Sequence, residues 1–163
     1  MSESSTGTGG ARDAGWGGQP VVVGIDGSPG SLVALQWAAE AARLRAVPLN
    51  VLFAWGDLGP RVVRTTRRGK EPTEADEQEA ALALIDQSVR EALGPEPGVE
   101  IIRLAERGEA TPALLEASKT ADLLVVGSRG RGGFAGLLLG SVSQHCIHHA
   151  HCPVAVIRQP AAA

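Results

Sequence analysis

The chain has 163 residues and a mass of 16.8 kDa, which suits one domain of ordinary size. Its content of 44% hydrophobic and 20% charged residues is typical of a globular protein and excludes a disordered or membrane-embedded chain. The net charge of −3, with only three Trp, two Phe and no Tyr, argues against nucleic acid as a partner.

The first residues predict a disordered tail at positions 1–19, because Gly, Ser and Thr dominate and apolar side chains are scarce. This segment lacks the apolar core of a signal peptide, and no apolar run is long enough to span a membrane. Cys146 and Cys152 are too few for the disulfide framework of a small secreted domain. We therefore expect a cytoplasmic protein with no membrane partner, whose domain covers residues 20–158 and ends in a short tail at 159–163.

The first half of this domain is predicted to fold as strand, helix, strand and helix. Its opening run is β-branched and lacks polar alternation, which is typical of a strand buried on both faces of a sheet. Ser28 followed by Pro29 favours a helix start, and Thr73 with Asp76 resembles a capping box. The expected ranges are 21–26 and 48–55 for strands, 29–45 and 73–93 for helices, and 56–72 for a polar loop.

The second half continues this alternation and ends in a strand. Thr111 with Pro112 favours a helix start, and Ser141 with Gln144 resembles a second capping box. The expected ranges are 99–105, 121–127 and 153–157 for strands, with helices at 111–119 and from 141. Alternating helices and apolar strands predict an α/β, Rossmann-like fold: a doubly wound, five-stranded parallel sheet with helices on both faces.

Two strand ends carry residues suited to ligand binding. One strand ends at Asp26, and another leads into a Gly-rich segment that runs to Gly140 and Ser141. Ligands bind such sheets at the carboxyl ends of the strands, where the winding direction reverses. If these two strands flank the reversal, the strand order is 3-2-1-4-5. The helix start at Ser141 would then offer free N–H groups and a positive dipole end to a phosphate, although the segment could also be a flexible loop.

Three separated segments together resemble the universal stress protein family. They are residues 22–28, the spacing Gly127-x2-Gly130-x9-Gly140-Ser141, and residues 152–156. The resemblance spans residues 20–158 and concerns the branch that keeps the glycine spacing and binds ATP. It implies a regulator of stress response or signalling that binds ATP, with Mg²⁺, and hydrolyses it slowly or not at all.

The same resemblance assigns roles to individual residues. It implies that Asp26 contacts the ribose or adenine side, that Ala54 and Trp55 line the adenine pocket, and that Gly127 contacts the ribose. The phosphates would be surrounded by Gly130, Gly140, Ser141 and Val142. Apart from the resemblance, Arg129 and Arg131 are candidate cations for the phosphates, because they lie within the Gly-rich segment itself. Asp26 could instead be a solvated turn residue beside Gly27. Trp55 departs from the small aliphatic residue expected there, and could either stack on the base or narrow the pocket.

Alternatives to this function follow from other features. A cyclic AMP sensor would need the same pocket, and a dimeric interaction module would leave the Gly-rich segment unused. A phosphotransferase or nucleotidyl-transferring enzyme of this fold is less expected, because no His-x-Gly-His signature follows the first strand. No catalytic triad or carboxylate pair can be assigned to the crevice, so we expect no catalytic residues.

Two further clusters of residues stand out in the sequence, one of metal-ligand types and one of positive charges. The first cluster is a set of transition-metal ligand types: His145, Cys146, His148, His149, His151 and Cys152. Its spacing does not match common zinc sites, and similar runs occur in universal stress proteins without metal, so we expect no metal. The second cluster is an Arg-rich stretch at 61–70, which is either a solvated loop or a cover for the phosphates.

The composition of the last predicted strand indicates that the protein forms a dimer. Residues 154–158 would lie at the sheet edge, yet residues 153–157 include no charged residue of the kind that keeps edges from pairing. We therefore expect a homodimer that pairs these strands about a two-fold axis, as universal stress protein dimers do.

Overall fold

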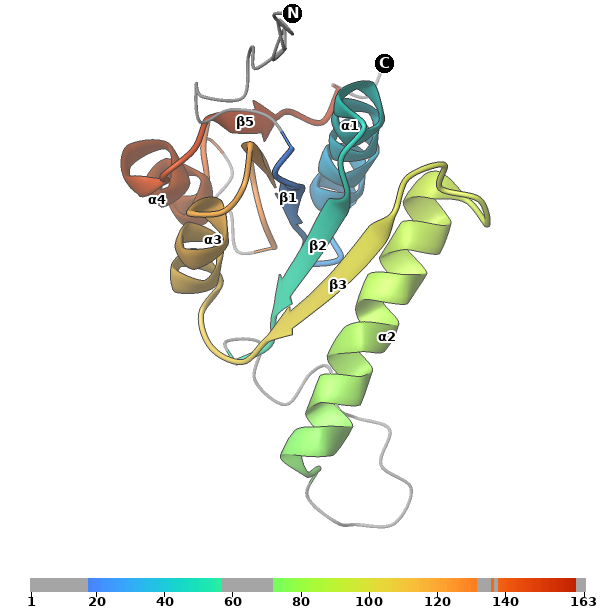
Figure 1. The fold of residues 1–163 in the computed structure, drawn as a ribbon. Helices are drawn as coiled ribbons and strands as arrows, with labels where there is room; N and C mark the ends of the chain where they lie inside the picture. The colour runs from blue at the N-terminus through green and yellow to red at the C-terminus, as the bar shows by residue number, and fades with distance from the viewer. Residues whose placement is uncertain (1–17, 57–71, 132–135, 137, 161–163) are drawn as a thin grey trace, which may run out of the picture.

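The computed structural model describes residues 18–56, 72–131, 136 and 138–160, and these form a five-stranded sheet covered by helices (Figure 1). The strand order is β3-β2-β1-β4-β5, and every neighbouring pair is parallel. The predicted fold class and strand order are therefore confirmed. The tail predicted at 1–19, apart from residues 18 and 19, and the whole Arg-rich stretch at 61–70 lie outside the described residues.

The elements follow the predicted alternation. The strands are β1 (Val21–Gly24), β2 (Leu49–Ala54), β3 (Ile101–Glu106), β4 (Leu123–Gly127) and β5 (Val154–Ile157). The helices are α1 (Pro29–Arg45), α2 (Glu74–Leu93), α3 (Ala110–Ser118) and α4 (Ser141–His149). Within the described ranges, none of these helices is long and apolar enough to cross a lipid bilayer.

The two faces of the sheet carry separate hydrophobic cores, because successive side chains of a strand point to opposite faces. Val21 and Val23 pack with α1 and α2 on one face, and Val22 and Leu124 pack with α3 and α4 on the other (Figure 1). Burying one such side chain contributes about 1.5–3 kcal/mol. This two-sided burial explains why the strand sequences show no polar alternation.

Two helix starts form as their sequences predict. Ser28 caps α1, and its Oγ accepts a hydrogen bond from the Ser31 N–H at 3.3 Å. Thr73 and Asp76 form a complete capping box at α2: the Thr73 N–H donates to Asp76 Oδ2 at 2.8 Å, and the Asp76 N–H donates to Thr73 Oγ1 at 3.2 Å. The Thr73 hydroxyl also donates to Asp76 Oδ2, at 2.7 Å. The bonds that the Thr73 N–H and hydroxyl donate to the carboxylate lower the pKa of Asp76.

The other two helix starts differ from the predictions. Helix α3 begins at Ala110 after Glu109, without a side-chain cap, rather than at Thr111. Helix α4 begins after Gly140, and no side chain caps it, so the predicted capping box of Ser141 and Gln144 is wrong. Its start is fixed instead by a contact that the local sequence does not contain: the Gly140 N–H donates to the Ser128 carbonyl at 2.7 Å.

Candidate ligand site at the carboxyl edge of the sheet

The winding of the chain reverses between β1 and β4, which pair at the centre of the sheet. The helix after β1 covers one face, and the helix after β4 covers the other (Figure 1). The segments that follow these two strands therefore diverge at the carboxyl edge, which is where doubly wound sheets bind ligands.

Asp26 joins the two diverging segments. Its Oδ1 accepts the Ser28 N–H at 2.8 Å, and its Oδ2 accepts the backbone N–H of Arg131 at 3.0 Å. The carboxylate is partly buried and fastens the Gly-rich segment to the end of β1. Each carboxylate oxygen has a second lone pair, so this side chain can still accept hydrogen bonds from ligand hydroxyls.

Two of the predicted glycines are needed by the fold itself. A Cβ at Gly130 would lie 2.8 Å from Asp26 Oδ2, and one at Gly127 would lie 3.3 Å from the Gly30 carbonyl oxygen. Gly140 differs, because a Cβ there would meet its nearest neighbours, including the Gly130 N, at an ordinary 3.7 Å. Close packing against the β1–α1 turn thus accounts for the first two glycines, whereas none of the described residues excludes a small side chain at Gly140.

The start of α4 is held in place but is left without a cap. Ser143, which is buried, donates from Oγ to the Gly127 carbonyl at 2.7 Å and ties the helix to the end of β4. Because its own N–H bonds to Ser128, Gly140 cannot offer that group to a ligand. The N–H groups of Ser141 and Val142 have no acceptor among the described residues, and they are the ones that an anion would meet.

The two predicted residues of β2 lie on opposite faces. Ala54 falls on the α3 and α4 side, following the alternation of the strand. Trp55 instead packs against the α1 and α2 core, where the guanidinium of Arg107 lies 5.8 Å from its ring centroid and pairs with Glu74 at 3.0 Å. The structure therefore does not bring the Trp55 ring to the start of α4.

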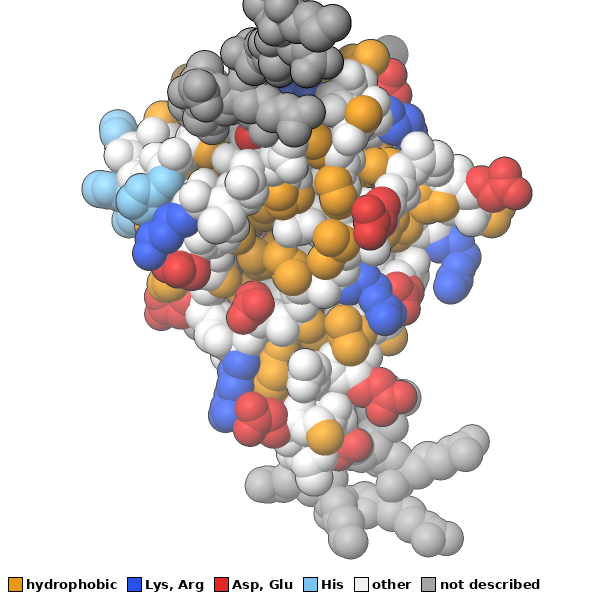
Figure 2. Space-filling model, viewed as in Figure 1, with side chains coloured by type: hydrophobic (Ala, Val, Ile, Leu, Met, Phe, Trp, Pro, Cys, Tyr) orange, Lys and Arg blue, Asp and Glu red, His pale blue; other side chains and the backbone are white. Residues whose placement is uncertain are grey.

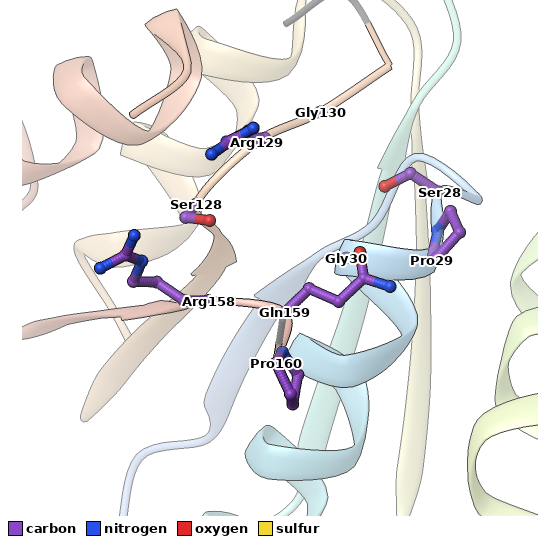
Figure 3. Close-up of a pocket in the computed structure, with 9 residues that line it drawn as sticks. All are labelled: Ser28, Pro29, Gly30, Ser128, Arg129, Gly130, Arg158, Gln159 and Pro160. Atoms are coloured by element: carbon purple, nitrogen blue, oxygen red, sulfur yellow. The ribbon is translucent and has the colours of Figure 1, made fainter. Parts of the chain in front are cut away.

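A pocket of about 650 Å³ opens at this edge, on the side of α1 (Figure 3). Its walls come from the segments that follow β1, β4 and β5. The lining residues are Ser28, Pro29, Gly30, Ser128, Arg129, Gly130, Arg158, Gln159 and Pro160. The sequence predicts Arg129 and Gly130 as ligand-binding residues at this edge but does not predict Arg158 or Gln159. The only signal for these two was the predicted pairing of the last strand with the fourth.

The histidine cluster is a surface feature. His145, His148 and His149 are exposed on α4 and form a patch on the face shown in Figure 2. Among the described residues, no group of three or more metal-ligating side chains is arranged to hold an ion. Burial raises the pKa of the Cys146 thiol to about 11 and also raises that of Cys152, so both favour the unreactive thiol form at neutral pH.

The comparison with protein families decides the identity of the domain. Residues 18–158, which contain both cores and all of the carboxyl edge described above except Gln159 and Pro160, match the model of the universal stress protein family. The chain belongs to the universal stress protein family. This assignment agrees with the three sequence segments from which the resemblance was inferred.

The chain is similar in sequence to universal stress proteins of bacteria. The chain is 41% identical over 141 residues to a universal stress protein of Mycolicibacterium smegmatis, which covers 85% of this chain and 45% of that protein. It is 39% identical over 146 residues to universal stress protein Rv2623 of Mycobacterium tuberculosis, with 84% and 46% covered. The chain thus spans about half the length of the curated relatives that it matches.

Solved universal stress proteins share the fold. One, in complex with cAMP, is 28% identical with a TM-score of 0.60, and the match covers 85% of this chain and 95% of that chain. Another, from Archaeoglobus fulgidus in complex with dAMP, is 27% identical with a TM-score of 0.55, covering 85% and 97%.

Proposed function

We propose that this universal stress protein binds an adenine nucleotide at the carboxyl edge of its sheet and acts in the cytoplasm as a regulator of stress response or signalling. The observation that carries the proposal is the uncapped start of α4, where the N–H groups of Ser141 and Val142 have no acceptor among the described residues. Related structures with cAMP and dAMP support an adenine nucleotide as the ligand class.

The geometry suggests a role for each part of the site. Phosphate oxygens would accept from the N–H groups of Ser141 and Val142, where the helix dipole favours an anion, and Arg129 would add a positive charge. Ribose hydroxyls would donate to the remaining lone pairs of Asp26. The base would lie on the Ala54 side of the sheet, while the Trp55 ring supports the end of β2 from the other face.

Within this class we propose ATP with Mg²⁺ as the physiological ligand. The two N–H groups that have no acceptor among the described residues, the positive end of α4 and Arg129 suit a phosphate chain with several charges. Cyclic AMP is the second candidate, because a universal stress protein of similar fold is known in complex with it. Hydrolysis would be slow, because the described part of the site contains no histidine or second carboxylate beside Asp26 to activate water.

Calorimetric titration of the full chain with ATP and Mg²⁺, AMP and cyclic AMP tests the proposal. We expect Gly140→Val to abolish binding, because its branched side chain would crowd the start of α4, while the circular dichroism spectrum stays unchanged. Ala75→Val, on the exposed first turn of α2, adds the same side chain away from the site and should bind normally. No binding of any adenine nucleotide by the wild type would contradict the proposal and favour an interaction module.

We also propose that β5 pairs with its counterpart in a homodimer through residues 154–158. β5 lies at one edge of the sheet, next to β4 only, and none of the residues from Val154 to Ile157 is charged. Val156→Lys should give a monomer in sedimentation equilibrium. Because Val156 also packs against the α3 and α4 core, Val156→Ala is the control for lost packing and should remain dimeric. A monomeric wild type at tens of micromolar would refute this pairing.

A further inference from the structure

The pocket on the α1 side has a positive character that the nucleotide site proposed above uses only in part, through Arg129. Arg129 and Arg158 line it, and no Asp or Glu is among its lining residues. In the described part of the chain, neither guanidinium forms an ion pair or a hydrogen bond. The Asp26 carboxylate lies beside this pocket, where it accepts the Ser28 N–H, but it forms no ion pair with either arginine among the described residues. Two arginines without an ion-pair partner in one concave site favour an anion over a cation or an apolar ligand.

The first turn of α1 adds to this field. Ser28 caps the helix through the Ser31 N–H, and Pro29 has no N–H, which leaves the Gly30 N–H without an acceptor among the described residues. No acidic residue lies in this turn to offset the dipole of the 17-residue helix. The absence of a Cβ at Gly30 lets the helix start pack closely on the segment that carries Arg129.

The side chain of Ser128 is the independent sign of a ligand. Ser128 is only 8% exposed, and its hydroxyl forms no hydrogen bond within the part of the chain that the structure describes. Its backbone is fixed on both sides: its N–H donates to the Ile157 carbonyl at 2.8 Å, and its carbonyl accepts from Gly140 at 2.7 Å. Figure 3 shows the hydroxyl pointing into the pocket, between Arg158 and the start of α1.

We propose that this pocket binds a phosphoryl group through the side chains of Ser128, Arg129 and Arg158 and the N–H of Gly30. A tetrahedral anion can accept from several directions at once. Arg129 and Arg158 are exposed, so their long side chains can turn toward an anion held by the Ser128 hydroxyl and the Gly30 N–H. The site is distinct from the start of α4, because Gly140, Ser141 and Val142 do not line it and residues 128–130 form the wall between the two. The phosphoryl group belongs either to a separate inorganic anion or to the far phosphates of a bound nucleotide.

Titration with inorganic phosphate and with pyrophosphate tests this site directly. Binding is monitored by NMR through the amide resonances of Gly30 and Ser128. We expect saturable shifts in the wild type, and an affinity about tenfold lower for Arg158→Gln, which loses a charge-assisted contact. Ser128→Ala should weaken binding severalfold; its hydroxyl has no partner to lose among the described residues, so the fold should be retained. Arg90→Gln, at an exposed position near the end of α2, is the matched control and should bind as the wild type does.

Nucleotide titrations then identify the source of the phosphoryl group. If it belongs to a nucleotide, Arg158→Gln lowers the affinity for ATP but not for AMP, and ATP displaces inorganic phosphate. If it is a separate anion, ATP affinity is unchanged and both ligands bind together. The proposal is overturned if neither anion shifts the two amides, or if Arg158→Gln and Ser128→Ala bind as tightly as Arg90→Gln. Gly140→Val should keep phosphate binding, which separates failure of this site from failure of the nucleotide site.

Discussion

Helices α1 and α4 both begin at the carboxyl edge of the central strands, but their first turns are built in different ways. α1 begins with a local side-chain cap from Ser28 and with Pro29, which has no N–H to satisfy. α4 has no side-chain cap and is positioned by contacts with the end of β4, through Ser128 and Gly127. A helix start held by distant segments keeps its own N–H groups available, which suits it to an anionic ligand.

The largest expected effect comes from the contact that holds the Gly-rich segment to β1. Gly130→Val would place a side chain 2.8 Å from Asp26 Oδ2 and force the segment away from it, at a cost of about 1–3 kcal/mol of unfolding free energy. Gly140→Ala, whose Cβ meets only ordinary contacts, should cost less than about 1 kcal/mol. Urea denaturation of both variants measures the difference, and equal losses would show that the steric argument is wrong.

The second prediction concerns the hydrogen bond that joins α4 to the end of β4, which one substitution can remove. Ser143→Ala removes the 2.7 Å hydrogen bond to the Gly127 carbonyl in a buried position, so we expect a loss of about 1–2 kcal/mol. Ser141→Ala, two residues earlier and exposed, should leave the unfolding free energy within about 0.5 kcal/mol of the wild type, because Ser141 caps nothing. If Ser141→Ala is the more destabilising of the two, α4 has a local cap after all.

At α1, in contrast to α4, we expect the residue before the helix to matter for stability, because its side chain caps the helix. Ser28→Ala removes the acceptor for the Ser31 N–H and should cost about 1 kcal/mol in thermal or urea unfolding. Ser28→Asn retains a capping side chain and should recover most of this loss. Equal stability of the alanine variant and the wild type would mean that α1, like α4, is positioned mainly by distant contacts.

The smallest effect concerns α2, whose capping box provides a third kind of start. The pKa of Asp76 is lowered in the folded protein by hydrogen bonds from Thr73, so its contribution to stability is present above pH 3.8 and is lost as the pH falls below that value. Asp76→Asn cannot titrate and should show a slightly shallower fall of stability between about pH 4 and pH 2 than the wild type. Unfolding curves across this range, with Glu79→Gln as an exposed control, measure it.

The capping residues show how far the sequence could predict local structure. Ser28 bonds to Ser31, and Thr73 bonds to Asp76, three residues further along in each case, so the spacing along the chain specifies these contacts. Ser141 and Gln144 have the same spacing but no capping bond, because the contacts of Gly140 and Ser143 with β4 already fix the start of α4. A local motif predicts a local contact only where no tertiary contact replaces it.

The sequence by itself determined the order of strands and helices, the burial of the central strands on both faces, and the presence of Asp26 and the glycines at the carboxyl edge. Only the tertiary structure decided that Asp26 reaches the N–H of Arg131, 105 positions further along the chain. It also decided that the Trp55 ring joins the α1 and α2 core, and that Arg158 meets Ser128 and Gly30 around one pocket. Apolar patterns specify which faces of an element are buried, whereas contacts between distant side chains depend on how the elements and the segments between them pack, which no local spacing encodes.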